Sequence, residues 1–253
     1  MTLSPNTFIQ CLFLLILSAK TLQPLMAQAK DGDHQPPARS IALDDVTDIE
    51  LAGGLTFEFV CGDRNEVSIH AAETRFYKVS RRANNLMIKQ KNLQQLWSRN
   101  RGNNSVHVII TSAGEIPDLE VESGVSGSVR TCLTPQPLLQ LKVATGSKIR
   151  LMQSQLGELA AKISTGSEIE IVEPVEVRQL FLHVGTGSQF YAGPKFTAVA
   201  ARVTASTGSY ANVCGANLVT GKVGTGSSVR VSSTATVDIK TSPTGGRVKQ
   251  GAC

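Results

Sequence analysis

The amino-acid sequence predicts an all-β fold, a right-handed, single-stranded parallel β-helix (solenoid) of about 20-residue coils with an N-terminal β-rich cap. Three observations support this prediction: a recurring Thr-Gly-Ser motif, short runs of alternating apolar residues around each motif, and few aromatic residues. The 253 residues include only 8 Phe, 3 Tyr and 1 Trp, which suits a core of small and β-branched side chains stacked in layers. A chain that is 41% apolar is neither disordered nor a small disulfide scaffold.

Residues 1–29 are expected to be a signal peptide. Residues 8–17 are apolar, and Ala27-Gln28-Ala29 is a small-residue cleavage pattern. The run is shorter than the roughly 20 residues of a membrane-spanning helix, and no later run approaches that length. We therefore expect an exported protein without a transmembrane span, located in the periplasm, on the outer-membrane surface or outside the cell. An uncleaved N-terminal anchor is the alternative.

Residues 30–45 are expected to form a mobile leader, and residues 46–121 a cap that lacks the repeat. The cap is predicted to contain strands at 55–61, 66–72, 85–90 and 105–111, with a short helix near 73–82 and a polar loop around 91–104. Such a cap is needed because a solenoid with an open end exposes apolar side chains and unpaired strand edges.

Residues 122–253 are predicted to form the repeat β-helix. Thr-Gly-Ser occurs at Thr145, Thr165, Thr186, Thr207 and Thr225, and degenerate copies lie at 124–131 and 243–250. We align the copies on the apolar residue after each turn: Val129, Ile149, Ile169, Phe190, Ala211, Val229 and Val248. The spacings are 20, 20, 21, 21, 18 and 19 residues. A leucine-rich repeat has a similar period, but its consensus and its helical half are missing.

Successive coils of a parallel β-helix pair at roughly 4.8 Å, so equivalent residues form columns along the axis. The Thr and Ser hydroxyls of the turns are expected to stack into ladders, and the turn glycines to hold backbone conformations that strain other residues. These glycines are Gly146, Gly166, Gly187, Gly208, Gly226 and Gly245.

Four cysteines remain after removal of residues 1–29, and in an oxidising compartment they allow three connectivities. Cys132 and Cys214 follow turns four coils apart, roughly 19 Å along the axis, which is too far for a disulfide. We favour Cys61 with Cys132, where the cap meets the first coil, and Cys214 with Cys253. The sequence contains neither a CxxC motif nor a Cys/His cluster, so no zinc site and no other cofactor is expected.

The sequence resembles the putative auto-transporter adhesin head GIN domain family, a DUF2807-type family of exported bacterial proteins found mostly in Bacteroidota. The resemblance rests on AGGLTFEF, on IPDLEVESG and on the serial glycine-serine turns, and it covers about residues 46–250. It implies a β-helix and, from the family name, adhesion. Family turns often read Gly-Ser-Gly-Asp, but here the acid position holds other residues, so no cation-binding Asp ladder is expected. These residues are Ser128, Lys148, Glu168, Gln189, Tyr210, Ser228 and Arg247.

One column offers a cation in each of six coils, and it is the candidate binding site. Its members are Lys142, Lys162, His183, Arg202, Lys222 and Lys240. Outward cations about 5 Å apart repel unless salt or an anion neutralises them. The column therefore predicts an anionic partner such as an envelope glycan or a lipopolysaccharide phosphate. The alternative is a solvated edge whose charges discourage aggregation. Another column mixes signs and aromatics and is expected to be an ordinary exposed face, although Tyr191 and Tyr210 could stack on a sugar.

Enzymatic chemistry has little support in the sequence. Glu168 and Glu170 lie on one face of a strand about 7 Å apart, compatible with an inverting glycosidase pair, but no neighbouring apolar segment would raise a pKa. His34, His70, His107 and His183 are scattered, and neither a GxSxG elbow nor a P-loop occurs. The net charge of +5 is mild and no nucleic-acid motif is present, so no nucleic-acid partner is expected.

The sequence thus predicts an exported, non-enzymatic envelope or surface protein, an adhesin-like module that presents a repetitive face. The alternatives are a polysaccharide-active β-helix enzyme and a purely structural periplasmic protein.

Overall fold

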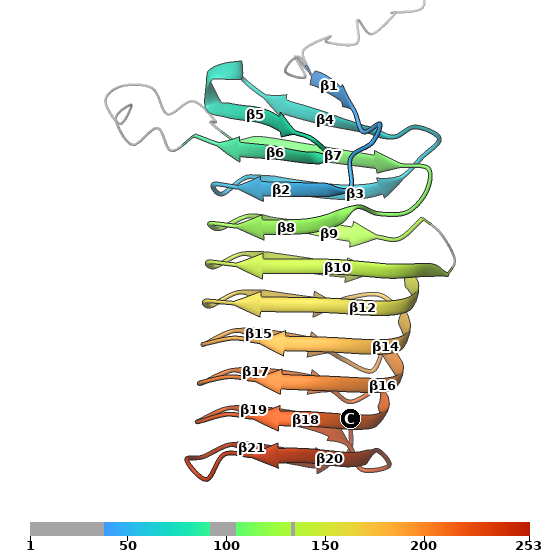
Figure 1. Ribbon diagram of the computed structural model, residues 1–253, viewed down its shortest axis with the longest axis vertical. Coiled ribbons are helices and arrows are strands. Elements are labelled where there is room, and N and C mark those ends of the chain that lie inside the picture. The colour runs from blue at the N-terminus through green and yellow to red at the C-terminus, as the bar shows by residue number, and fades with distance from the viewer. Residues whose placement is uncertain (1–37, 92–104, 133–134) are drawn as a thin grey trace, which may run out of the picture. The chain divides into compact units, whose positions relative to one another are not determined.

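A computed structural model of the protein describes residues 38–91, 105–132 and 135–253, and the predicted signal peptide lies outside this part of the chain. In the described residues the chain forms two long β-sheets that face each other, as the sequence predicts (Figure 1). The coils wind in a right-handed sense, and the described residues contain no α-helix.

The ten-stranded sheet has the order β20-β18-β16-β14-β12-β10-β8-β2-β6-β5. Its strands are β2 (Asp48–Ala52), β5 (Tyr77–Arg82), β6 (Asn85–Gln90), β8 (Asp118–Glu122), β10 (Gln136–Ala144), β12 (Ser154–Ser164), β14 (Val175–Val184), β16 (Phe196–Ala205), β18 (Ala216–Val223) and β20 (Thr236–Thr241). Every pairing in it is parallel except that of β5 with β6.

The eleven-stranded sheet has the order β1-β4-β7-β3-β9-β11-β13-β15-β17-β19-β21. Its strands are β1 (Ala38–Ala42), β3 (Thr56–Cys61), β4 (Glu66–Ala71), β7 (Val106–Ser112), β9 (Ser126–Arg130), β11 (Lys148–Met152), β13 (Glu168–Ile171), β15 (Gln189–Ala192), β17 (Tyr210–Val213), β19 (Ser228–Ser232) and β21 (Arg247–Gly251).

The core lies between the two sheets, where alternate residues of each strand point inward. Along β12, for example, Leu159 and Ile163 are fully buried while Lys162 is exposed. Among the described residues of the repeat coils, one core layer is aromatic, the edge-to-face pair of Phe190 and Phe196, with ring centroids 6.3 Å apart. Aliphatic side chains from Ala and Val to Ile and Leu fill the other described layers, which accounts for the scarcity of aromatic residues.

The Thr-Gly-Ser turns lie at one edge of the solenoid, and their glycines have the left-handed backbone expected of them. The turns have two geometries. At Thr145 and Thr165 the threonine is also left-handed, with φ of 55° and 54°. In the next three coils only the glycine has a left-handed backbone. There the serine N–H donates to the carbonyl oxygen of the residue three positions earlier, as Ser188 does to Gly185 at 3.1 Å.

The turn serines are buried and form the predicted hydroxyl ladder. They are Ser147, Ser167, Ser188, Ser209 and Ser227. The N–H of Ser147 donates to the hydroxyl of Ser167 at 3.3 Å, and that of Ser209 to the hydroxyl of Ser227 at 3.2 Å. The ladder therefore satisfies backbone donors that the turns would otherwise bury without partners.

The N-terminal coils are not stacked in chain order. The coil of β2 and β3 lies between the coil of β6 and β7 and the coil of β8 and β9. Its turn, Gly53-Gly54-Leu55, is a copy of the motif that the sequence analysis did not recognise, with both glycines left-handed. The two sheets thus continue into residues 48–61.

The end of the solenoid is covered by β1, β4 and β5, which pair antiparallel with their neighbours. Two expectations are wrong here. Residues 38–42, predicted to belong to a mobile leader, form β1. The predicted helix near 73–82 is only the 3-10 turn η1 (Thr74–Phe76), and β5 follows it, because Tyr77 and Val79 alternate toward the core as in a strand. The predicted loop around 91–104 lies almost wholly outside the described residues.

The alignment of the first degenerate repeat is wrong by two residues. Val129 pairs with Leu151 rather than with Ile149, which faces Gly127. The turn of this coil is Ser123-Gly124, both left-handed, and Val125 takes the position that serine holds in the later coils.

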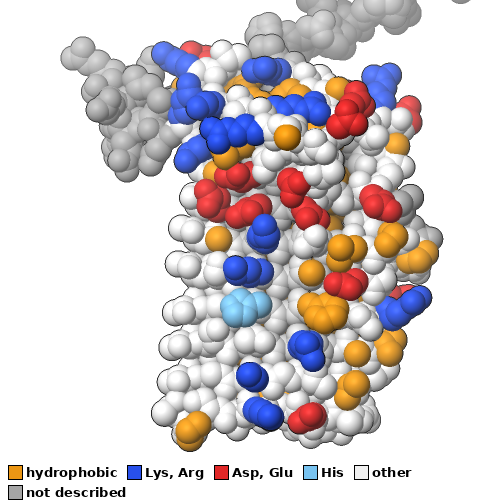
Figure 2. All heavy atoms as spheres, in the orientation of Figure 1, with side chains coloured by type: hydrophobic (Ala, Val, Ile, Leu, Met, Phe, Trp, Pro, Cys, Tyr) orange, Lys and Arg blue, Asp and Glu red, His pale blue; other side chains and the backbone are white. Residues whose placement is uncertain are grey.

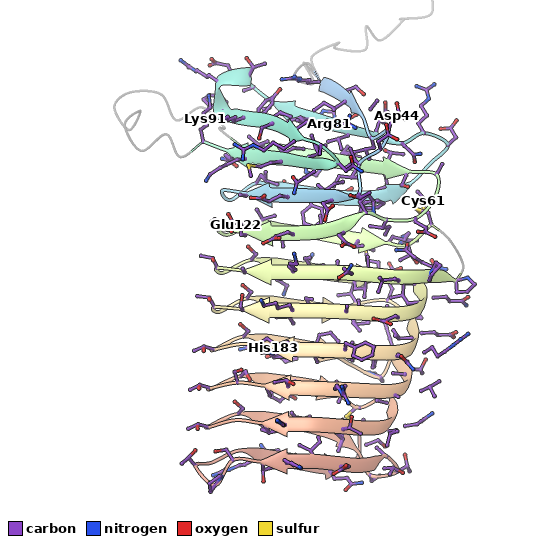
Figure 3. All side chains as sticks on the ribbon, viewed as in Figure 1. Asp44, Cys61, Arg81, Lys91, Glu122 and His183 are labelled. Atoms are coloured by element: carbon purple, nitrogen blue, oxygen red, sulfur yellow. A yellow bond between two sulfur atoms is a disulfide. The ribbon has the colours of Figure 1, made fainter. Side chains whose placement is uncertain are left out.

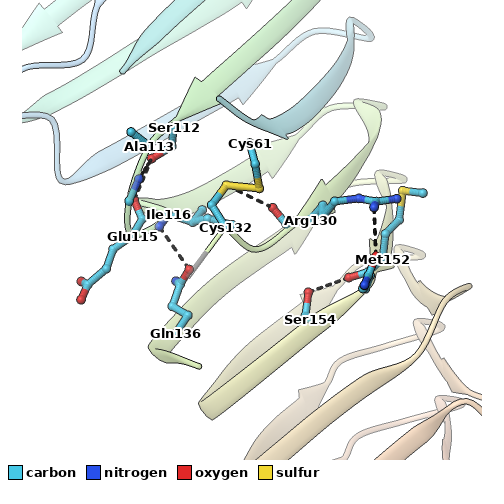
Figure 4. The surroundings of a disulfide bond; sticks show 12 residues. Cys61, Ser112, Ala113, Glu115, Ile116, Arg130, Cys132, Gln136, Met152 and Ser154 are labelled. Atoms are coloured by element: carbon cyan, nitrogen blue, oxygen red, sulfur yellow. Dashed lines mark hydrogen bonds between the residues drawn. A yellow bond between two sulfur atoms is a disulfide. The ribbon is translucent and has the colours of Figure 1, made fainter. Parts of the chain in front are cut away.

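Two disulfides join the pairs that the sequence analysis favoured, Cys61 with Cys132 and Cys214 with Cys253. The first links the end of β3 to the segment after β9, two neighbouring strands of the eleven-stranded sheet (Figure 4). The second links the segment after β17 to the residues that follow β21. Each disulfide therefore fastens one end of the stack of repeat coils.

Candidate functional site

The outer face of the ten-stranded sheet carries the predicted cation column, with one correction. Lys142, Lys162 and His183 are in register on consecutive strands, and Lys222 is in register with Lys240. The place between His183 and Lys222 is held by Thr204.

Arg202 does not belong to this column. It pairs with Phe181 and therefore lies two residues along the strand, in the adjacent column on the same face. Val203, the apolar residue that follows Arg202, pairs with Leu182, and the small residue Ala205 is the partner of Val184. The column of cations is thus interrupted at Thr204, and Arg202 lies in the adjacent column beside that position.

Most of these cations have no acidic partner. Lys142 forms an ion pair with Glu120 at 3.3 Å. Among the described residues, no carboxylate lies within 4.0 Å of the Lys162, Arg202, Lys222 or Lys240 side chain. Figure 2 shows this face with lysine and arginine side chains above and below the single histidine. The coils from β12 to β20 therefore present cations that form no ion pair with a carboxylate in the part of the chain that the structure describes.

A shallow groove of about 360 Å³ lies among the cations, and we call it the Phe181 groove. Phe181 points outward and is 38% exposed, and its neighbour in register on β12 is the small residue Ala160. Ala160 leaves the space that the groove occupies. The groove is lined by Gln140, Leu141, Lys142, Ala160, Ala161, Lys162, Phe181, Leu182, His183, Arg202 and Thr204.

The floor of the groove is the sheet itself. Leu141, Ala161 and Leu182 belong to the core and are at most 3% exposed. A ligand in the groove therefore lies on the sheet and cannot insert between the two layers. Figure 3 labels His183 near the middle of this face. The groove could not be predicted from the sequence, because only the register of β12 against β14 places Ala160 beside Phe181.

An acidic patch adjoins the column on its N-terminal side, over β2 and β8 (Figure 2). Asp48 faces Asp118 and Glu50 faces Glu120 across the strand pair. Burial, and then the charges of Glu122 and Glu120, raise the pKa of Glu50, while Lys89 opposes them. Burial and then Asp48 raise the pKa of Asp118, while the hydrogen bond from Gln140 and the charge of Lys142 lower it. The outer face thus changes sign between the cap and the repeat coils.

The carboxylates considered for catalysis lie on the opposite sheet and share one cation. The Lys148 ammonium is 2.8 Å from a Glu168 oxygen and 2.9 Å from a Glu170 oxygen. Hydrogen bonds to Glu168 and then Glu170 raise the pKa of Lys148. All three side chains are about one-third exposed. The pair is held as part of a surface ion-pair network, outside any enclosed pocket that would favour a protonated acid.

The two tyrosines proposed for sugar stacking are neighbours on this sheet. The ring centroids of Tyr191 and Tyr210 lie 5.3 Å apart, with the planes tilted by 47°. The Tyr191 hydroxyl donates to the side-chain oxygen of Gln189. Burial, followed by the charge of Glu168, raises the pKa of Tyr191.

The histidines do not gather into a site. His70 and His107 are cap-strand residues in register on β4 and β7, with rings 6.3 Å apart, and His107 shares a hydrogen bond with Thr56. His34 lies outside the described residues. Within the described ranges, no three His, Cys, Asp or Glu side chains are grouped closely enough to hold a metal ion. The same ranges contain no helix long and apolar enough to cross a membrane.

Comparison with known proteins gives one family and several similar structures. The family described as "Putative auto-transporter adhesin, head GIN domain" matches residues 45–235. No curated protein matches the chain.

Among solved structures, a protein from Bacteroides fragilis named a putative adhesin superposes with a TM-score of 0.67 at 11% identity, over 86% of this chain and 96% of the other. A protein from Parabacteroides distasonis named a putative lipid binding protein gives 0.58 at 15% identity, over 87% and 98%. A putative adhesin from the same organism gives 0.57 at 12% identity, over 87% and 98%. At these identities the likeness is one of fold.

Proposed function

Because the chain belongs to the family described as "Putative auto-transporter adhesin, head GIN domain", we propose that it is an exported, non-enzymatic envelope or surface protein. In this proposal it acts as an adhesin-like module whose outer face on the ten-stranded sheet binds an anionic envelope component such as a glycan. The family name and the adhesin neighbours support binding as the general role.

The observation that carries the proposal is the set of cations without acidic partners on one flat face. Like charges stacked on neighbouring coils, roughly 4.8 Å apart, repel each other. Salt bridges to acidic residues would remove this cost, yet Lys162, Arg202, Lys222 and Lys240 have none in the part of the chain described. A bound polyanion neutralises several of them at once and releases the counterions that they hold.

The fold supplies rigidity to this face. Consecutive strands from β8 to β20 pair in parallel, and a disulfide fastens each end of the repeat coils. A preorganised surface loses little conformational entropy when it binds a long ligand. The ion pairs of Lys148 with Glu168 and Glu170 support a non-enzymatic role, because both carboxylates already balance a cation.

The test is binding of the full chain to immobilised inorganic polyphosphate, with neutral dextran as the reference surface. We expect binding to polyphosphate that weakens as salt increases, because the Debye length shortens to about 3 Å at 1 M ionic strength. Lys162→Gln/Lys222→Gln/Lys240→Gln should weaken it roughly tenfold, at about 0.5 kcal/mol for each exposed cation.

The matched control is Lys78→Gln/Lys195→Gln/Lys249→Gln, which removes the same charge outside the column. An equal loss of polyphosphate affinity in the two triple variants would mean that only the net charge of the protein matters, and would contradict a specific binding face. Absence of binding to polyphosphate at low salt would contradict the proposal outright. Export is tested separately by the mass of the protein recovered outside the cytoplasm, where loss of residues 1–29 is expected.

A further inference from the structure

We propose that the Phe181 groove takes an acidic saccharide, with the apolar face of a pyranose ring on Phe181 and its carboxylate between Lys162 and Arg202. The inference rests on the proposed function, because it names the chemical class of ligand for the same face. It adds a requirement that a plain polyanion does not meet, namely a ring of suitable shape.

Phe181 presents an exposed aromatic ring with vacant space beside it. Phe181 is in register with Ala160 on one side and Arg202 on the other. With alanine in the neighbouring coil, one side of the Phe181 ring stays open to the groove instead of packing on a larger side chain. Aromatic faces of this kind bury apolar area and prefer flat partners.

Two cations, Lys162 and Arg202, lie on either side of the ring. Lys162 lines the groove on the β12 side of Phe181, and Arg202 lines it on the β16 side. Neither has an acidic side chain within 4.0 Å among the described residues. A guanidinium matches a carboxylate with two parallel hydrogen bonds, so Arg202 favours a planar carboxylate.

The shape of the floor decides between a sugar ring and an acyl chain. The side chains beneath the groove are packed in the core and at most 3% exposed, so the groove has no depth into which a lipid tail could enter. A single saccharide ring placed against Phe181 fits a groove this shallow. The proposed ligand is therefore an acidic sugar rather than a lipid.

The charge pattern also sets the direction in which a longer chain extends. On the N-terminal side of the groove, Lys142 is paired with Glu120, and the acidic patch of β2 and β8 follows. These carboxylates repel an acidic polymer. Toward the C-terminus the face offers Lys222 and Lys240, with Thr204 leaving a gap between His183 and Lys222. Further units of an acidic polysaccharide therefore run from the groove toward β18 and β20.

The test is calorimetric titration of the full chain with three probes: hexagalacturonate, its methyl ester, and inorganic polyphosphate of similar charge. Hexagalacturonate should bind, and the ester should bind at least roughly tenfold more weakly because it lacks the carboxylates. Phe181→Ala should weaken hexagalacturonate roughly three- to tenfold, the usual value of one aromatic stacking contact. It should leave polyphosphate binding unchanged.

Two variants on the same sheet serve as controls. Leu218→Ala removes a side chain that is 40% exposed, close to the 38% of Phe181, but lies outside the groove. Arg178→Gln removes an exposed cation from β14, the strand of Phe181, and is compared with Arg202→Gln. Leu218→Ala should have no effect on hexagalacturonate, and Arg202→Gln should weaken it by a larger factor than Arg178→Gln.

The outcomes separate this inference from the proposed function. Binding of polyphosphate and hexagalacturonate with equal affinity, both insensitive to Phe181→Ala, would overturn the saccharide assignment and leave the anionic face intact. Binding of neither probe would overturn both. Tight binding of the methyl ester would show that the ring matters and the carboxylate does not, which would also overturn the inference as stated.

Discussion

The backbone N–H of Ser147 donates a hydrogen bond to the side-chain hydroxyl of Ser167 in the next coil, at 3.3 Å. The Ser167 hydroxyl in turn donates to the carbonyl oxygen of Ser164 at 2.7 Å. The hydroxyl of Ser147 is buried and has no partner among the described residues. Val125 occupies the equivalent position in the preceding coil, so no hydroxyl continues the ladder there.

Ser167→Ala should therefore destabilise the protein by about 1–3 kcal/mol, because it leaves a buried backbone N–H without its acceptor. Urea unfolding followed by circular dichroism measures the change. Ser147→Ala is the matched control, with the same atoms removed from an equally buried turn, and should not lower the free energy of unfolding, because the Ser147 hydroxyl has no partner to lose among the described residues. Equal losses in the two variants would mean that the ladder does not contribute.

Replacing Thr165 with Asn should stabilise the fold. Thr165 has a φ of 54°, a left-handed backbone that strains a β-branched residue and that Asn tolerates well. We expect a gain of about 1 kcal/mol in the free energy of unfolding. Thr207→Asn, at the same motif position but without a positive φ, should give no gain. A gain in both variants would point to the side chain rather than to backbone strain.

The stability of the cap coils should depend on pH through Glu50. Because its pKa in the folded protein is raised above the ordinary 4.5, the folded state holds this proton more tightly than the unfolded state. The resulting stabilisation of the folded state is complete when the pH is below the ordinary pKa, and it is lost as the pH rises through the raised pKa. Glu50→Gln should thus leave stability unchanged near pH 3 and increase it at pH 7, by roughly 0.2–1 kcal/mol.

The control for Glu50→Gln is Glu176→Gln on β14. Glu176 is exposed, and its in-register neighbours, Gln155 and Thr197, are uncharged. Its replacement removes one carboxylate from the same sheet without changing the stacked carboxylates of β2 and β8. If urea unfolding at pH 3, 5 and 7 gave Glu50→Gln the same free energies of unfolding as the parent, repulsion among the stacked carboxylates of β2 and β8 would not affect stability.

Removal of the Cys61–Cys132 disulfide should cost about 4 kcal/mol in the chain-entropy description, since the bridge spans 71 residues. Cys61→Ser/Cys132→Ser is compared with the oxidised parent by urea unfolding. Peptide mapping without reduction checks the pairing first, and a Cys61–Cys253 peptide would contradict it. A loss below about 1 kcal/mol would mean that the ends of β3 and β9 stay together in the unfolded chain.

The period of the winding and its turns could be predicted from the sequence because they repeat a local signal, and the cysteine pairs followed from the distances that this period sets. Gly146 and its equivalents identify the turns, and the spacing of about 20 residues identifies the coil. The register of individual strands was less accessible. Ala205 is buried in the core and pairs with Val184, but as a small residue it is not recognisable in the sequence as the equivalent of a valine. The prediction therefore places Arg202 in the wrong column.

Two other features could not be predicted because they depend on contacts between distant segments. Val125 and Leu55 stand where the motif has Ser, and only the pairing of β9 with β11 and of β3 with β9 reveals the equivalence. The Phe181 groove depends on which residue of β12 faces β14. A single residue type in one coil does not carry that information.

The placement of the β2–β3 coil between two coils made from later segments also constrains how the protein folds. Thr56 pairs with Ser126, 70 residues further on, whereas neighbouring repeat coils join residues only about 20 apart. Closing the longer loop is slower and costs more chain entropy. A chain emerging during synthesis therefore cannot complete its first layer until most of the cap has been made. The later coils, whose partners are always close by, are the natural place for assembly to begin.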